Sequence, residues 1–132
     1  MFFMRRNRRQ YLRYREDARA LVRARLAYYN QHYQLPIRKI FIKDLKSRWG
    51  SCSERGNLNF NYRLVLLPPE IADYIIVHEL CHLREFNHAP NFWAAVAETL
   101  PHHKTLRQHL RTLEKSQPVA VRSFFGRLRG TY

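Results

Sequence analysis

The sequence predicts a single α+β domain in which a long helix precedes a small, mostly antiparallel sheet, and further helices follow. Residues 5–33 lack glycine and proline and repeat apolar side chains at helical spacing, whereas much of 37–62 alternates apolar and polar residues. With 132 residues and 45% hydrophobic content, the chain fits one domain with a core. We expect a basic helix over 1–36, the core of the fold over 37–115 and a basic tail over 116–132.

The first helix is expected over residues 5–33, and Pro36 closes the segment. Apolar residues recur along one stripe, which includes Ala18, Val22 and either Tyr28 or Tyr29. A helix needs such a stripe in order to pack against a core. The aromatic residues on it are therefore expected to pack in the core rather than to stack on nucleic-acid bases.

Three strands are expected next. Residues 37–43 read as a strand, and 48–53 and 58–62 flank the turn residues Gly56 and Asn57, which tolerate positive φ. A hairpin is therefore predicted around residues 54–57. Trp49 is expected to anchor the core beneath it.

Three more helical stretches follow the strands. Pro68 and Pro69 mark a helix start, and this helix is predicted to run to about Arg84, with Asn87 as a left-handed residue after it. A second helix is expected after Pro90 and ends before Pro101. Residues 102–115 are predicted to form a third.

Positive charge dominates the composition. The net charge is +14, and residues 1–30 carry nine arginines against Glu16 and Asp17. Such a surface attracts DNA or another polyanion, although it is equally what a solvated helix face presents. No apolar run is long enough to span a membrane, and the first residues do not resemble a secretory signal, so we expect a cytoplasmic protein. Cys52 and Cys81 are expected to be buried thiols rather than a disulfide.

The chemistry is predicted to lie in the run His78-Glu79-Leu80-Cys81-His82. Residues four apart lie above one another on a helix, so the imidazoles of His78 and His82 can bind one metal ion. Glu79 follows the first ligand and is placed to act as general base toward a water at the metal. The spacing of the two histidines and the glutamate therefore predicts a catalytic zinc site with one Zn²⁺ per chain, although nickel, cobalt or manganese suit the same ligands.

A third protein ligand is needed, and two candidates remain. His88 follows His78 by ten residues and can return to the metal through a short turn, whereas Glu98 lies on the next predicted helix. Imidazole is a common zinc ligand and the turn is short, so we favour His88. His102 and His103 are interpreted as exposed residues at a helix start. Arg48, Tyr62 and Tyr74 are the candidates for an additional oxyanion donor.

Several separated motifs follow one another in order: Arg48-Trp49-Gly50-Ser51-Cys52, Asn59, Arg63-Leu64-Val65-Leu66, Pro68-Pro69, Val77 through Leu83, Asn87-His88 and Phe92-Trp93. Together they resemble the YgjP-like metallopeptidase family over residues 38–113. This resemblance implies a minimal gluzincin-like fold, with a catalytic core over 37–115, zinc on His78, His82 and His88, and Glu79 as base. The family is also similar to the SprT and WLM proteases, which act on proteins linked to DNA.

The function predicted from these observations is a zinc-dependent peptidase that acts on peptide or protein substrates, including DNA-associated proteins. An extended substrate is expected to lie along an exposed strand edge between Gly50 and Asn61. Two alternatives stay open: a metal-dependent hydrolase of an anionic substrate such as a nucleotide phosphoanhydride, and a non-catalytic nucleic-acid-binding module with structural zinc. The chain has no glycine-rich phosphate loop, which disfavours the first alternative.

Overall fold

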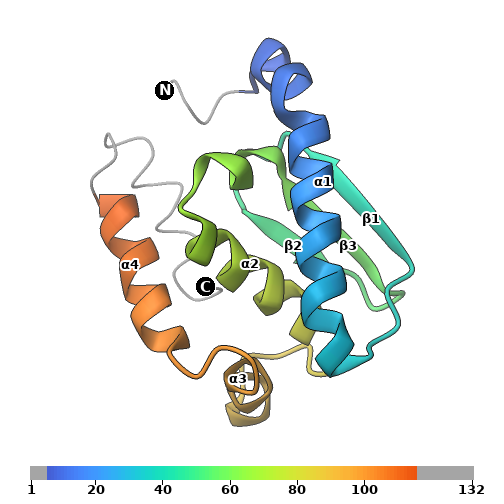
Figure 1. Ribbon diagram of the computed structural model, residues 1–132, viewed down its shortest axis with the longest axis vertical. Helices are drawn as coiled ribbons and strands as arrows, with labels where there is room; N and C mark the ends of the chain where they lie inside the picture. The colour runs from blue at the N-terminus through green and yellow to red at the C-terminus, as the bar shows by residue number, and fades with distance from the viewer. Residues whose placement is uncertain (1–5, 116–132) are drawn as a thin grey trace.

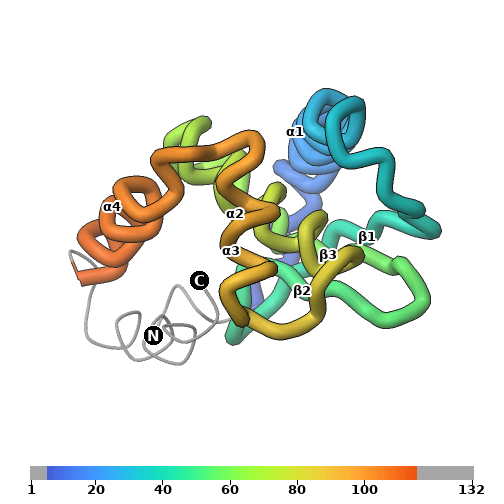
Figure 2. Tube along the Cα trace, turned by 90° about the horizontal axis from the view of Figure 1, so that it is seen from below, coloured from blue at the N-terminus to red at the C-terminus, as the bar shows by residue number. Residues whose placement is uncertain are grey.

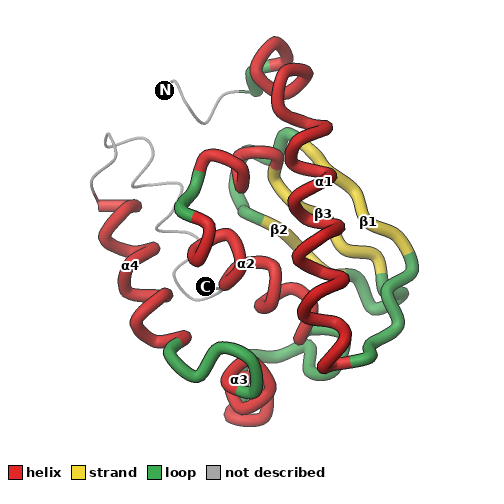
Figure 3. The backbone as a smooth tube through the Cα atoms, viewed as in Figure 1, coloured by secondary structure: helices red, strands yellow, loops and turns green. Residues whose placement is uncertain are grey.

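The computed structural model describes residues 6–115, which form an α+β fold (Figures 1 and 3). The basic tail predicted over 116–132 lies outside these residues, as do the first five residues of the chain. Helices and strands follow the predicted order. The elements are α1 (Arg8–Tyr33), β1 (Lys39–Lys43), β2 (Gly50–Cys52), β3 (Asn57–Asn61), the 3-10 helix η1 (Tyr62–Leu66), α2 (Pro69–Cys81), α3 (Pro90–Ala97) and α4 (His103–Lys115).

Helices α1 and α2 lie side by side on one face of the sheet, with α3 and α4 farther out (Figures 1 and 2). The core lies between the sheet and these two helices, because alternate side chains of β3, Leu58 and Phe60, are fully buried. Val22 and Leu26 from α1 belong to the same cluster. Trp49, predicted as a core anchor, is 5% exposed. No helix within residues 6–115 has the length and hydropathy to cross a lipid bilayer.

The sheet is mixed, which corrects the prediction of a mostly antiparallel sheet. The strand order is β1-β3-β2, with β3 parallel to β1 and antiparallel to β2. The expected hairpin joins β2 to β3, and Gly56 occupies its turn with φ of 91°. The chain crosses over between β1 and β2, so β1 meets β3 in parallel. Strands β1 and β2 are therefore the two edges of this sheet.

Helix α1 begins where Asn7 caps it, because the Asn7 side chain accepts a hydrogen bond from the backbone N–H of Gln10. It ends at Gln34, which has φ of 53°. Of the two tyrosines expected on the apolar stripe, Tyr29 is buried and Tyr28 is 57% exposed. The stripe thus faces the core as predicted, with Tyr28 on the solvent side.

A polar clamp joins α1 to α2. The Arg25 guanidinium donates two hydrogen bonds of 2.9 Å to Asp73, one to each carboxylate oxygen. The Tyr29 hydroxyl donates a third, also of 2.9 Å, to the same carboxylate. Farther along α1, the Tyr33 hydroxyl donates to the carbonyl oxygen of Ala95 on α3 at 2.6 Å. These bonds fix the position of α2, which carries the candidate site.

Helix α2 ends earlier than predicted. It begins at Pro69 as expected, but its regular part stops at Cys81, and tighter turns occupy the residues up to Arg84. The N–H of Leu83 donates to Leu80 and that of Arg84 to Cys81, which are bonds across three residues. Asn87 does not have positive φ, so the prediction of a left-handed residue there was wrong.

Candidate metal centre

Three imidazoles converge at the end of α2. His78 and His82 project from the same face of α2, and His88 returns to them from the loop before α3. The Nε2 atom of His88 lies 3.1 Å from Nε2 of His82 and 3.2 Å from Nε2 of His78. Nitrogens that bind one tetrahedral zinc ion at ~2.0–2.1 Å are separated by roughly 3.3 Å. The cluster therefore fits a metal ion, and these three residues are the ones that could hold it.

The other ring nitrogen of His82 sets its tautomer. Nδ1 of His82 lies 3.0 Å from the carbonyl oxygen of Glu85, which can only accept a hydrogen bond. Nδ1 thus carries the proton, and Nε2 presents its lone pair to the cluster. The tight turns after Cys81 bring the carbonyl oxygen of Glu85 within hydrogen-bond distance of Nδ1 of His82, so the early end of α2 contributes directly to the site.

Burial favours the uncharged form of the His82 and His88 imidazoles. His78 is fully buried and His82 is 7% exposed. Burial, together with the charge that His78 and His82 carry when protonated, lowers the pKa of His88 to about 4. Burial and His78 also lower the pKa of His82. Near neutral pH the His82 and His88 rings are therefore neutral, which is the form that binds metals.

Glu79 lies beside the cluster and is 2% exposed. Its Oε2 atom is 3.3 Å from Nδ1 of His78, and its side chain packs over β2 at Gly50. The carboxylate contributes to raising the pKa of both the Cys52 thiol and the Tyr74 hydroxyl, although burial is the larger cause in each case. Glu79 is therefore a carboxylate at the rim of the histidine cluster, adjacent to a ligand but outside the ligand set.

Aromatic side chains from α3 form one wall of the site. The Phe92 ring stacks on His82 at a centroid distance of 4.5 Å and meets the edges of His78 and His88 at 5.0 Å. Trp93 lies 6.0 Å from His88. This wall limits the orientations of the imidazoles and excludes water from their outer side. The sequence presented Phe92 and Trp93 as apolar helix residues and as one motif of the family resemblance, but it did not place them against the imidazoles.

His103 and Arg107 extend this wall onto α4. His103 was considered from the sequence as a residue that could line the cleft, although an exposed position was favoured, and Arg107 was missed. The His103 ring stacks on Trp93 at 5.4 Å and 15°, and the Arg107 guanidinium lies 5.2 Å from the centre of the same ring. His103 is buried, which corrects its interpretation as an exposed residue, whereas His102 is exposed as expected. Burial lowers the pKa of His103, and so do the nearby charges of Lys104 and Arg107. The i, i+4 spacing of His103 and Arg107, which places both side chains on one face of a helix, was the sequence feature that could have indicated a shared position.

The alternative third ligand, Glu98, is directed elsewhere. Its carboxylate lies 2.8 Å from both Arg84 and His32, on the exposed surface between α1 and α3. The geometry therefore places His88, and not Glu98, with His78 and His82.

The three candidates for an oxyanion donor lie in different parts of the structure. Arg48 is exposed, and the hydroxyl of Tyr62 donates to Gln10 at 2.7 Å, toward α1. Tyr74 lies one turn before His78, with a ring-centroid distance of 6.2 Å. Only Tyr74 of the three adjoins the histidine cluster.

Comparisons with known proteins identify the family of the chain. No functionally curated protein matches the chain in sequence. Among solved structures, the chain resembles the crystal structure of the metallopeptidase zymogen of Pyrococcus abyssi abylysin, with a TM-score of 0.63 and 27% sequence identity. That match covers 71% of this chain and 95% of abylysin. A family model, the YgjP-like metallopeptidase domain, matches residues 5–113. The chain belongs to the YgjP-like metallopeptidase domain family.

Proposed function

We propose that the protein is a zinc-dependent peptidase in which His78, His82 and His88 hold the metal and Glu79 is the general base. The observation that carries this proposal is the convergence of three imidazoles, in which Nε2 of His88 lies 3.1 and 3.2 Å from the Nε2 atoms of the buried His82 and His78. The Glu79 carboxylate lies 3.3 Å from the other ring nitrogen of His78. Membership of a metallopeptidase family supports peptide-bond hydrolysis as the reaction.

Zinc is the proposed metal because the donor set consists of imidazoles. Imidazole nitrogen suits zinc, and a catalytic zinc site has three protein ligands and one position for water or substrate. The metal-binding group found among residues 6–115 has three members, which agrees with this count. When bound, zinc supplies a Lewis acid for the scissile carbonyl and lowers the pKa of a water ligand from 15.7 to ~7.

Glu79 is proposed to move the proton. Its carboxylate accepts a proton from the attacking water and then passes it to the leaving amine. Its position supports this role, because it adjoins His78 yet lies outside the ligand set. The helix backbone fixes Glu79 one residue after a ligand, and Gly50 leaves room for its side chain over β2.

Strand β2 is the proposed support for an extended substrate. An extended substrate was predicted to lie along a strand edge between Gly50 and Asn61, but β3, which forms part of this stretch, is the central strand and has partners on both sides. That part of the prediction was wrong, and β2 is the edge next to Glu79. Ser53 donates to Asn57 and Asn61 donates to Trp49 across the β2–β3 pair, so by alternation the backbone N–H of Cys52 faces the free edge. We expect Cys52→Pro, which removes this N–H, to abolish peptide cleavage while metal binding persists. Unchanged cleavage would exclude strand pairing at this edge.

The two alternative functions are less well supported. A structural zinc site commonly has four protein ligands rich in cysteine, whereas this group has three histidines. A nucleotide hydrolase requires groups that bind phosphate, and the wall nearest the cluster consists of Phe92 and Trp93. Peptidase activity accounts for the carboxylate, the ligands and the family together.

DNA-associated proteins are the proposed substrate class, with α1 as the surface that contacts DNA. Three of its arginines form ion pairs, since Arg15 and Arg19 pair with Glu16 and Arg25 pairs with Asp73. Arg8, Arg9 and Arg13 are exposed on the same helix. Charge-driven binding weakens as salt rises. We expect duplex DNA to bind in a salt-dependent way and to bind less tightly after Arg8, Arg9 and Arg13 are each replaced by Glu. Binding that is insensitive to salt would exclude this role.

The experiment that tests the proposed function is Glu79→Gln in the zinc-loaded protein, assayed against a fluorogenic peptide library. We expect one zinc per chain to be retained and turnover to fall on the order of 10²–10⁴-fold. Glu98→Gln is the matched control, because it makes the same chemical change at an exposed position and should leave turnover unchanged. Near wild-type activity in Glu79→Gln would show that Glu79 is not the base.

A further inference from the structure

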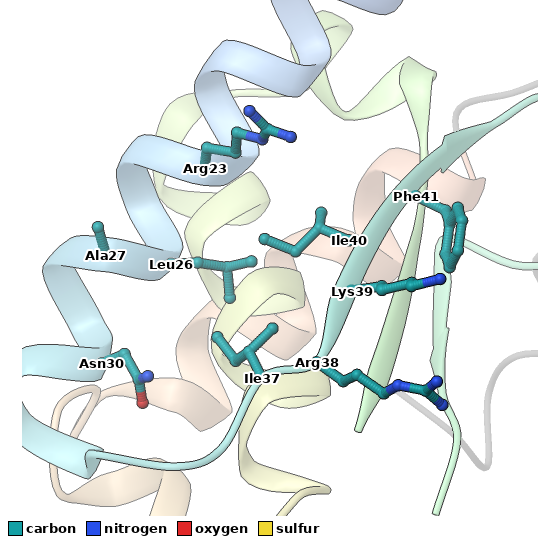
Figure 4. A pocket seen from close by; sticks show the side chains of 9 residues that line it. All are labelled: Arg23, Leu26, Ala27, Asn30, Ile37, Arg38, Lys39, Ile40 and Phe41. Atoms are coloured by element: carbon teal, nitrogen blue, oxygen red, sulfur yellow. The ribbon is translucent and has the colours of Figure 1, made fainter. Parts of the chain in front are cut away.

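A groove of about 550 Å³ lies between α1 and β1 (Figure 4). None of its lining residues belongs to the histidine cluster. The α1 residues share one helix face, since they follow at intervals of three, one and three. The groove is lined by Arg23, Leu26, Ala27 and Asn30 from α1 and by residues 37–41.

The outer wall of this groove is the edge of a strand. Successive side chains of a strand point to opposite faces, so five consecutive residues can line one pocket only if the backbone edge itself forms the wall. Strand β1 pairs with β3 on one side, and among residues 6–115 no strand pairs with its other side. An unpaired edge of this kind is a template for a further strand.

The inner side of the groove is apolar. Leu26, Ile37 and Ile40 point into the space between helix and strand (Figure 4). Ala27 on α1 is exposed and small, which leaves room above them. A strand added to β1 would direct every second side chain into this space, where apolar residues are favoured.

Three of the remaining lining residues are basic. Arg38 and Lys39 project away from α1 along β1, beside Phe41, and Arg23 reaches across from the helix (Figure 4). No acidic residue contributes to the lining. The remaining side chains of an added strand would lie next to Lys39 and Phe41. Acidic side chains are favoured there, because opposite charges directly across a strand pair attract each other.

Two contacts limit the groove. At one end the Tyr11 hydroxyl donates to the carbonyl oxygen of Ile42 at 3.1 Å, which occupies the strand backbone there. At the other end the Asn30 side chain bonds both the N–H and the carbonyl oxygen of Leu35, which closes the turn after α1. Between them, residues 37–41 offer roughly 3.3 Å of edge per residue, enough for about five residues of ligand.

We propose that this groove is a docking site for an extended protein segment that alternates apolar and acidic residues and binds as a fourth strand on β1. The apolar side chains of the segment enter the space above Leu26 and Ile40, and its carboxylates face Lys39 and the neighbouring arginines. Backbone hydrogen bonds supply affinity and the two faces supply specificity. Binding in this groove does not depend on catalytic activity. A segment bound here lies on the edge of the sheet opposite to β2.

The experiment measures fluorescence anisotropy of a labelled decapeptide that alternates Val and Glu, added to the full chain carrying Glu79→Gln so that it is not cleaved. Ala27→Trp fills the groove, and Ala24→Trp is its matched control, because Ala24 is also exposed on α1 but does not line the groove. Lys39→Glu reverses a charge in the groove, and Lys104→Glu makes the same change on α4. Circular dichroism confirms that each variant is folded.

We expect Ala27→Trp and Lys39→Glu each to weaken binding at least tenfold, while the two controls stay within twofold of the parent. A decapeptide with the same composition in two blocks, five Val then five Glu, should bind at least fivefold more weakly. Equal binding to the Ala27→Trp and Ala24→Trp variants would overturn the proposal. So would tighter binding of a ten-nucleotide thymidine strand that competes with the peptide, which would make the groove a nucleic-acid surface. Neither result depends on whether Glu79 is the catalytic base.

Discussion

Gly50 leaves the space that the Glu79 side chain occupies. A Cβ atom at Gly50 would lie 3.1 Å from Cγ of Glu79 and 2.8 Å from the carbonyl oxygen of Asn59. The second distance is to backbone of the central strand, which cannot move without disturbing the sheet. Strand β2 and helix α2 are therefore in close contact at the candidate catalytic residue, because no side chain separates them.

Gly50→Ala should consequently destabilise the protein and impair the site. We expect a loss of about 1–3 kcal/mol in the free energy of unfolding, as for overpacking in a core. Turnover should fall as well, because Glu79 must shift, whereas zinc content should not. Urea denaturation and the peptide assay measure the two effects. Ser51→Ala, the next residue on β2, is the control, and equal effects at both positions would contradict this account.

The reactivity of Cys52 should report the charge of Glu79. Burial, and next the Glu79 carboxylate, raise the pKa of this thiol to about 12 from an ordinary value of 9.0. Removing the negative charge favours the thiolate, so Glu79→Gln should lower the pKa and accelerate alkylation by iodoacetamide at pH 8.5. The measurement uses a Cys81→Ala background, in which Cys52 is the single cysteine. An unchanged rate would place the carboxylate away from β2 or show it to be uncharged.

The sequence was sufficient to predict the part of the site that lies on one helix. His78, Glu79 and His82 have relative positions that helical geometry fixes, so their spacing alone predicts convergence. The choice of His88 over Glu98 required the path of a loop and the direction of a short helix. The surroundings of Glu98 decide it, because Arg84 and His32 hold that carboxylate at the surface.

Long-range packing accounts for what the sequence did not predict. The parallel pairing of β1 with β3 depends on the crossover before β2, which leaves no local pattern in residues 44–49. His103 reads as a solvated residue at a helix start, yet it is buried, and Trp93 from another helix stacks on it. The left-handed position belongs to Gln34 and not to Asn87, which shows that asparagine favours this conformation without requiring it.

The third ligand can be tested by substitution. His88→Ala should weaken zinc affinity more than ~100-fold, because it removes one of three protein ligands. Glu98→Ala should leave the affinity within threefold of the parent. Competition with a chromophoric chelator measures both values. Should Glu98→Ala cost more than His88→Ala, the ligand set described above would be incorrect.

The clamp between α1 and α2 should contribute measurably to stability. Asp73 accepts two bonds from Arg25 and one from Tyr29, so Asp73→Ala leaves two partly buried donors without their acceptor. We expect a loss of about 1–3 kcal/mol in guanidinium denaturation. Glu16→Ala is the comparison, because Glu16 forms an exposed ion pair with Arg19 and should contribute far less. Similar losses in both variants would remove the basis for assigning the clamp a structural role.

The most direct test of the central claim is a crystal structure of the zinc-loaded protein with anomalous data collected at the zinc absorption edge. The account predicts one strong peak per chain, at ~2.0–2.1 Å from Nε2 of His78, His82 and His88, with Glu79 outside direct coordination. A peak coordinated by Glu98 or His103 in place of His88, or the absence of a peak at the three imidazoles, would contradict it.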